Sequence, residues 1–205
     1  MRVLPLHRDD PADYSGVAYW VLGENNSPLD CNTLIDTGST DPANLAFFLQ
    51  EMARQPKGIG KKAVEQVLLT HGHFDHSGGL LGIEEQFDPT TYSWFPHGRH
   101  HQTIRDGMAL RIGDQMATLL HTPGHSEDSI CIFLPDTGTL FSGDTLYRIS
   151  DHQGIYSQAY ADTLERLSCL AIRTIFPGHG RPITQEPIAY IKACLGNVRH
   201  SRIQD

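Results

Sequence analysis

The sequence has few cysteines, no excess of positive charge and no long apolar run. Its four cysteines are far apart and form no Cys-x-x-Cys pair, so no zinc knuckle or dithiol motif is indicated, and we expect reduced, mostly buried thiols. The formal net charge is -8, which argues against nucleic acid as a partner because phosphate binding relies on clustered Lys and Arg.

The N-terminus reaches charged residues before any apolar run of signal-peptide length, and no later segment has the roughly 18 apolar residues of a membrane span. We therefore expect a cytoplasmic protein that does not bind membranes. A length of 205 residues with 39% hydrophobic content is enough for one sizeable core, which predicts a single domain over residues 1–205. The abundance of histidine, with 12 residues, is unusual and is not a terminal tag.

Short apolar strands alternate with helices along the chain. The predicted strands are 16–23, 32–38, 63–69, 90–95, four more between 108 and 143, and 172–176. A helix begins with Asp41 as N-cap and Pro42 at its first position, and further helices are predicted over 79–87, over 161–169 and after Pro187. Two sets of strands with interspersed helices indicate two packed sheets covered by helices on the outside.

The stretch LTHGHFDHSGG, residues 69–79, places four metal-binding side chains directly after a buried strand. Loops at strand ends are common positions for functional residues. His71 and His73, two apart in extended backbone, are expected to face one metal, while Asp75 and His76 turn to a second. We expect Phe74 to point between them, into the protein.

Three more candidate ligands follow short apolar strands in the same way. They lie in HTPGHSEDS, LFSGDTLY and TIFPGHG, and are His125, Asp144 and His179. Each has a glycine nearby that lets the backbone turn tightly. Five histidines and two aspartates, without a thiolate, suit two zinc ions better than copper(I) or an iron-sulfur cluster, with manganese and iron as alternatives.

These motifs, together with L-I-D-T-G at 34–38, resemble the metallo-β-lactamase superfamily from about residue 17 to residue 182. The resemblance implies an α/β fold, a four-layer αβ/βα sandwich of two mixed sheets flanked by helices. It also implies two metal sites and that Asp36 orients one of the ligands without contacting a metal itself, although Asp36-Thr37-Gly38 is equally well explained as a turn. The implied ligands are His71, His73 and His125 for one metal, Asp75, His76 and His179 for the other, and Asp144 for both.

The resemblance implies hydrolysis of a small ester, thioester or lactone, with a bridging hydroxide as nucleophile. Asp75 and Tyr147 are the candidate catalytic residues, Tyr147 because it matches a tyrosine of superfamily lactonases, although packing within the sandwich would explain it equally well. True β-lactamases have Cys or His at the position of Asp144, so antibiotic hydrolysis is not expected. The Cys-Gly-Arg segment that helps hold glutathione in related enzymes is also absent after Asp144.

Three other functions fit parts of the sequence. His71, His125 and Asp144 can form a two-histidine, one-carboxylate set around a single Fe(II), as in a persulfide dioxygenase. Phosphodiester or RNA cleavage uses nearly the same ligands. PKGIGKKAVEQVL, residues 56–68, resembles a helix-hairpin-helix element that binds DNA, but it requires 63–68 to be helical, whereas the metal loop requires a strand there.

The substrate is expected to be a small molecule, and its identity is not encoded in any single motif. Segment 88–107 is one candidate for a rim over the metals, although a polar connection is the simpler interpretation. It supplies Trp94, Phe95, His97, Arg99, His100 and His101. Arg148 is a second candidate, for contact with an anionic substrate, although a solvated surface position is favoured.

Overall fold

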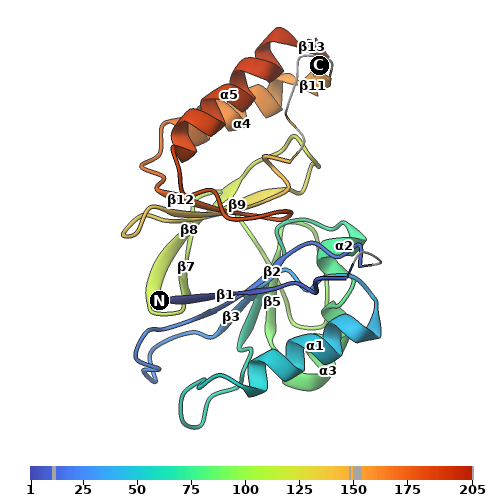
Figure 1. The fold of residues 1–205 in the computed structure, drawn as a ribbon, viewed down its shortest axis with the longest axis vertical. Coiled ribbons are helices and arrows are strands. Elements are labelled where there is room, and N and C mark those ends of the chain that lie inside the picture. The colour runs from blue at the N-terminus through green and yellow to red at the C-terminus, as the bar shows by residue number, and fades with distance from the viewer. Residues whose placement is uncertain (11–12, 148, 150–153, 205) are drawn as a thin grey trace.

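The computed structural model describes residues 1–10, 13–147, 149 and 154–204. Two mixed sheets pack against each other, α1 and α3 cover the outer face of one, and α4 and α5 cover the outer face of the other (Figure 1). The four-layer sandwich predicted from the sequence is therefore confirmed.

The first sheet has six strands in chain order. They are β1 (Arg2–Leu6), β2 (Ala18–Leu22), β3 (Thr33–Ile35), β4 (Gln66–Leu68), β5 (Thr90–Ser93) and β6 (His101–Thr103). The pairs β1–β2 and β2–β3 are antiparallel, and the pairs from β3 to β6 are parallel. The parallel pairs place the carboxyl ends of β3, β4 and β5 at one edge, where residues that follow these strands can meet.

The second sheet has five strands in a different order. It runs β12 (Thr174–Pro177), β10 (Thr139–Gly143), β9 (Ile130–Leu134), β8 (Gln115–His121) and β7 (Met108–Ile112). Only β10 and β12 are parallel; the other pairs are antiparallel. A separate parallel pair joins β11 (Ile155–Ser157) to β13 (Arg202–Gln204). The parallel β10–β12 pair brings the residues after both strands, Asp144 and His179, to the same edge.

Strand periodicity explains how one chain fills three apolar layers. In β2, Ala18, Trp20 and Leu22 belong to the core beneath α1 and α3, whereas Tyr19 and Val21 belong to the core between the two sheets. In β9, alternate residues divide in the same way between the inter-sheet core and the core beneath α4 and α5. Side chains of a strand point to opposite faces in turn, so strands buried on both faces appear in the sequence as continuous apolar runs.

The described residues also contain five helices. They are α1 (Pro42–Ala53), α2 (Phe74–Ser77), α3 (Leu80–Phe87), α4 (Gln158–Ser168) and α5 (Pro187–His200). The predicted start of α1 is confirmed, because the Asp41 side chain accepts a hydrogen bond from the Ala43 amide and Pro42 is the first helical residue. The short α2 was not predicted, and it divides the motif at 69–79 into an extended half and a helical half.

One prediction about local structure is wrong, and one of the alternatives left open is excluded. Phe74 is 66% exposed, because the turn of α2 directs its ring to solvent and not into the protein. The helix-hairpin-helix interpretation fails because β4 pairs with β3 and β5, so residues 66–68 are a strand. Gly58–Lys61 instead forms an exposed turn, with Ile59 fully exposed. The short strands β1, β6, β11 and β13 were also not predicted.

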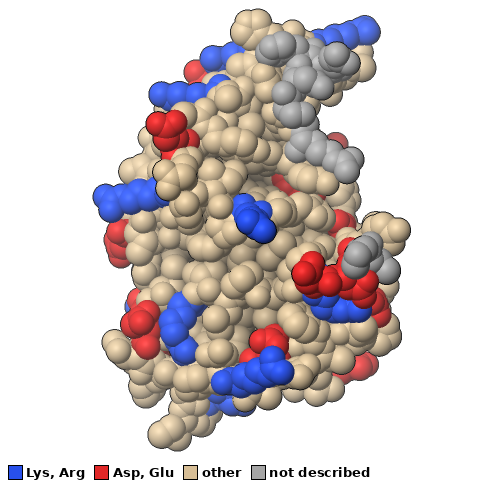
Figure 2. All heavy atoms as spheres, viewed as in Figure 1, with Lys and Arg blue, Asp and Glu red and all other residues tan. Residues whose placement is uncertain are grey.

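No helix in the described part of the chain is long and apolar enough to cross a membrane. On the face shown in Figure 2, Lys and Arg side chains are spread among acidic and uncharged residues and are not gathered into one patch. The four cysteines are free thiols: Cys131 and Cys194 are buried, Cys31 is half-buried and Cys169 is exposed.

Candidate metal centre

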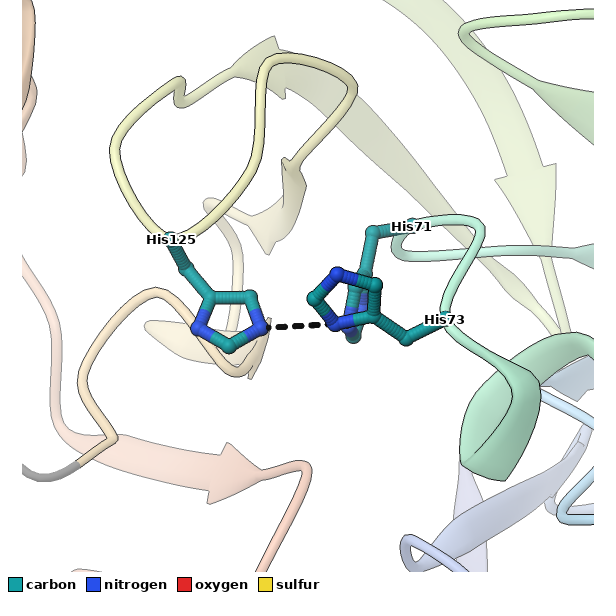
Figure 3. Close-up of side chains that lie close together, drawn as sticks. All are labelled: His71, His73 and His125. Carbon is teal, nitrogen blue, oxygen red and sulfur yellow. Dashed lines mark hydrogen bonds between the residues drawn. The ribbon is translucent and has the colours of Figure 1, made fainter.

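Four loops that follow strands of the two sheets converge at one edge of the sandwich. The loop after β4 carries His71 and His73, and the loop between β8 and β9 carries His125. Asp144 directly follows β10, and His179 follows β12. Figure 3 shows His71 and His73 reaching from one loop toward His125 on another. All seven ligands predicted from the sequence lie in this region.

The first group of donors is His71, His73 and His125. The Nδ1 atom of His73 lies 3.1 Å from Nε2 of His71 and 3.0 Å from Nε2 of His125 (Figure 3). One nitrogen from each ring lies within 4.8 Å of the others. Three imidazole nitrogens thus face a common point.

The second group is Asp75, His76 and His179, with donor atoms again within 4.8 Å of one another. The Nε2 atom of His179 lies 3.2 Å from Oδ2 of Asp75 and 3.3 Å from Nε2 of His76. Asp75 and His76 belong to α2, so the helical turn separates them from His71 and His73 and directs them to a different point.

Asp144 lies between the two groups. Its Oδ2 atom is 3.7 Å from Nε2 of His125 and 3.4 Å from Nε2 of His179. Its Oδ1 atom is buried and has no hydrogen-bond partner among the described residues, although Nε2 of His76 is at an ion-pair distance of 3.3 Å. A buried carboxylate oxygen without a hydrogen bond is costly unless a cation is available.

The donor set fits divalent metal ions. Metal–nitrogen bonds of about 2.0–2.1 Å in a tetrahedral site hold ligand atoms about 3.3–3.4 Å apart. The separations quoted above for the two groups, 3.0–3.3 Å, lie close to this value. Imidazole and carboxylate donors without thiolate suit zinc, manganese or iron, so the residues present can hold metal.

Asp36 fixes the orientation of His76 by contacting the ring nitrogen that faces away from the site. Its Oδ2 atom lies 2.8 Å from Nδ1 of His76, which leaves Nε2 of His76 facing the site. Oδ1 of Asp36 accepts the Thr70 amide at 2.7 Å, and Oδ2 accepts the Thr70 hydroxyl at 2.8 Å. The carboxylate therefore holds both a histidine and the start of the loop that carries His71 and His73, a role that a plain turn residue would not have.

The pKa values of the candidate ligands differ from one residue to the next. Burial lowers the pKa of His76, but the Asp36 and Asp144 carboxylates outweigh burial and raise it to about 10. Burial and the charge of His76 lower the pKa of His71 to about 4. Burial raises the pKa of Asp144, but His179 and His76 outweigh it and hold that pKa well below its ordinary value.

Two glycines allow the close approach of backbone to the ligands. A Cβ atom at Gly178 would lie 2.3 Å from Oδ1 of Asp144 and 2.7 Å from Cε1 of His76. A Cβ atom at Gly16 would lie 2.5 Å from Cε1 of His76. Side chains at these positions would displace the ligands, so the site depends on both glycines.

Asp128 was not among the sequence predictions, yet it joins the two loops that carry the first group. Its Oδ2 atom accepts the Gly72 amide at 2.7 Å, and its Oδ1 atom accepts the Ser126 hydroxyl at 2.7 Å. Gly72 separates His71 from His73, and Ser126 follows His125. The polar run HSEDS contained the residue, but no local pattern indicated its partner 56 positions away.

The residues proposed to contact substrate are only partly assembled around the site. The ring of Tyr147 lies 4.7 Å from that of His179, at 31° between planes, and Tyr147 is 37% exposed. Of segment 88–107, His97 reaches the metal loop, because a Cβ atom at Gly72 would lie 3.1 Å from its Cε1 atom. Trp94 instead stacks on His121, with ring centroids 3.7 Å apart. Arg148 lies outside the described residues.

Comparison with known proteins is consistent with the donor set. The family model described as "Metallo-beta-lactamase superfamily" matches residues 15–179. An atrochrysone carboxyl ACP thioesterase of Aspergillus fumigatus is 28% identical over 156 residues, which are 75% of this chain and 36% of that protein. A probable hydroxyacylglutathione hydrolase of Schizosaccharomyces pombe is 29% identical over 172 residues, 80% of this chain and 67% of that protein.

The fold has counterparts among solved structures. A beta-lactamase domain protein from Burkholderia ambifaria aligns with a TM-score of 0.73 at 20% identity, over 97% of this chain and 71% of that one. This likeness concerns the fold alone. The chain spans only about half the length of several curated relatives that it matches, with 55% for one of them.

Proposed function

Because the chain belongs to the metallo-β-lactamase superfamily, we propose that it is a metal-dependent hydrolase of a small ester, thioester or lactone. The single observation that carries the proposal is Asp144, whose one oxygen faces a histidine of each group while the other is buried without a hydrogen bond. A carboxylate in this position is suited to two cations at once.

Each ligand has a proposed place. His71, His73 and His125 would hold one metal ion, Asp75, His76 and His179 would hold the other, and Asp144 would be shared by the two sites. Zinc is the proposed metal, with manganese or iron as alternatives. When bound, two such ions supply an activated water and polarise the carbonyl of the substrate.

The protein's own residues position the metal ligands and support the reacting groups. Asp36 keeps Nε2 of His76 directed at the site, and Asp128 keeps the two loops of the first group together. We assign to Tyr147 the support of the developing oxyanion or the leaving group, because its ring lies beside His179. In the overall reaction, the oxygen of water joins the acyl carbon, the C–O or C–S bond breaks, and the leaving group takes a proton.

Two relatives support an acyl bond as the target. One is named a carboxyl ACP thioesterase and the other a probable hydroxyacylglutathione hydrolase. The dispersed Lys and Arg side chains on the face in Figure 2 agree with a small substrate better than with nucleic acid. We propose a cytoplasmic enzyme without a membrane partner.

Metal content and hydrolysis test this function together. The full chain is purified without added metal, its metals are quantified, and its activity is assayed on a panel of esters, thioesters and lactones. We expect two zinc ions per chain and loss of hydrolysis after chelation, with recovery on adding zinc. His200→Ala, at an exposed histidine at the C-terminal end of α5, is the control and should change neither result. One iron per chain, or hydrolysis that survives chelation, would contradict the proposal.

A further inference from the structure

A small cavity opens beside the second group of donors. It has a volume of about 280 Å³ and includes His179 in its lining. Leu146, Pro177 and Ile183 supply apolar walls. A cavity of this size next to a metal ligand is suited to a short acyl chain.

One cation faces this apolar space. Arg181 lines the cavity together with Tyr147 and Tyr190, and it is the only Lys or Arg in the lining among the residues that the structure describes. Within residues 1–10, 13–147, 149 and 154–204, Arg181 makes no ion pair or hydrogen bond. An exposed arginine is ordinarily a solvated surface residue, but this one lies in the wall of a pocket and has no partner among the described residues.

The loop that carries Arg181 is held in place at both ends. The Gly178 amide donates to the Gly143 carbonyl at 2.8 Å. Ile183 exchanges two backbone hydrogen bonds with Ile175 of β12, at 3.0 and 2.9 Å. Because Arg181 lies two residues after His179 within this short loop, its backbone has a fixed position relative to the second group of donors.

Tyr190 joins helix α5 to the segment that follows Asp144. Its hydroxyl donates to the Leu146 carbonyl at 3.4 Å, and Leu146 follows Asp144 by two residues. The cavity is therefore enclosed by three segments that are bonded to one another, not by side chains on independent loops.

We propose that this cavity binds an acyl chain that ends in a carboxylate, and that Arg181 pairs with this carboxylate. This inference rests on the proposed function, since it names the substrate class of the same site. A guanidinium presents a planar fork that matches a carboxylate with two hydrogen bonds. With a net charge of -8, the chain as a whole repels anions, so a single cation in the pocket would give a carboxylate-bearing substrate a local advantage.

Matched substrates test the inference directly. The phenyl thioesters of glutarate and of pentanoate have acyl chains of similar length, but only the glutaryl chain ends in a carboxylate. We expect the wild-type enzyme to favour the glutaryl thioester by about tenfold in kcat/KM, the scale of one charge-assisted pair at a partly exposed site. Arg181→Gln should bring the ratio close to one, and Arg181→Glu should favour a 5-aminopentanoyl thioester instead.

Arg173→Gln is the matched control. Arg173 is an exposed arginine just before β12, whereas Arg181 follows that strand. Arg173→Gln removes the same charge from the chain as Arg181→Gln does, but it leaves the charge in the cavity. The ratio of the two kcat/KM values should therefore stay at the wild-type value. An unchanged ratio in Arg181→Gln, or an equal fall in Arg173→Gln, would overturn the inference.

A binding measurement separates this inference from the proposed function. Calorimetry compares glutarate with pentanoate as ligands of the metal-loaded protein; each has a carboxylate that can reach the metals, but only glutarate has a second. We expect about tenfold tighter binding of glutarate by the wild type, and no difference in Arg181→Gln. Equal binding by the wild type refutes the carboxylate site. If no thioester is hydrolysed but glutarate is preferred, the proposed function fails and the pocket assignment stands.

Discussion

Asp36 holds His76 from behind: Oδ2 of the carboxylate lies 2.8 Å from Nδ1 of the imidazole, and both side chains are buried. Asp36 itself adopts a left-handed backbone conformation, with φ of 58°, which is uncommon for a residue other than glycine. An unusual backbone that places a carboxylate beside a candidate metal ligand is consistent with strain retained at a functional site.

Asp36→Asn is predicted to weaken metal binding by about 10–100-fold, the usual effect of removing a partner of a ligating histidine. The amide keeps the shape but not the charge that favours the orientation of His76. Competition with a chromogenic chelator measures the affinity. Asp136→Asn, at an exposed aspartate in the β9–β10 turn, serves as control. Equal affinities in the two variants would argue that Asp36 is only a turn residue.

Asp128→Ala is predicted to lower metal affinity at the first group without unfolding the protein. Its carboxylate links Gly72 and Ser126, so its loss frees the loops of His73 and His125 relative to each other. Metal titration should show weaker binding of one ion, by about tenfold, in the range typical of residues that support metal ligands. Glu127→Gln removes an exposed neighbouring charge and should have no effect. If Glu127→Gln weakens metal binding as much as Asp128→Ala does, the loss of affinity comes from the lost charge and not from the position of the loops.

Metal binding is predicted to release a proton from His76. Its pKa is raised to about 10, so at neutral pH the metal-free imidazole is protonated, and only its neutral form binds metal. His71, whose pKa is lowered to about 4, is already neutral and releases none. Metal affinity should therefore rise with pH, by about tenfold per unit for each proton released. Calorimetry in buffers of different ionisation enthalpy counts the protons, and a count of zero would contradict this assignment.

Substitution of single histidines should show which donors belong to each of the two metal sites. His179→Ala is predicted to lower the metal content toward one ion per chain, because His179 belongs only to the second group. His71→Ala is predicted to damage both, because His71 also lies close to His76 and Asp144. Elemental analysis after dialysis gives the content. Wild-type stoichiometry in both variants would refute the ligand assignment.

Tyr147→Phe is predicted to lower kcat by about tenfold or more, since loss of a donor to a developing oxyanion costs on the order of 10²–10³ at a fully formed site. The hydroxyl is the only group removed, and the ring beside His179 is kept. Metal content should stay at the wild-type value, which separates a catalytic effect from a loss of metal. Unchanged turnover on every substrate that the wild type hydrolyses would leave Tyr147 as a packing residue.

Much of the fold followed from local patterns. Apolar runs and turn residues located the longer strands, and Asp41 and Pro42 marked the start of α1. The strands that were not predicted are short or carry polar and charged residues, as in His101–Thr103 and Arg202–Gln204. Their conformation depends on pairing with distant strands, and a local pattern contains no information about such pairing.

The sequence by itself determined the type and the approximate place of the chemistry. Histidines and aspartates directly after buried strands fixed the donor set, and strand alternation fixed which side chains fill each layer. The tertiary structure supplied the cause of the predicted division of the donors: the helical turn α2 directs Asp75 and His76 away from His71, and Asp144 lies between the two groups.

Only the tertiary structure revealed the contacts between distant segments. Asp128 meets Gly72, Phe74 faces solvent, and Arg181 lines a cavity beside His179. The physical reason is that periodicity and capping act over a few residues, whereas these contacts depend on how the ends of different strands meet at one edge of two packed sheets.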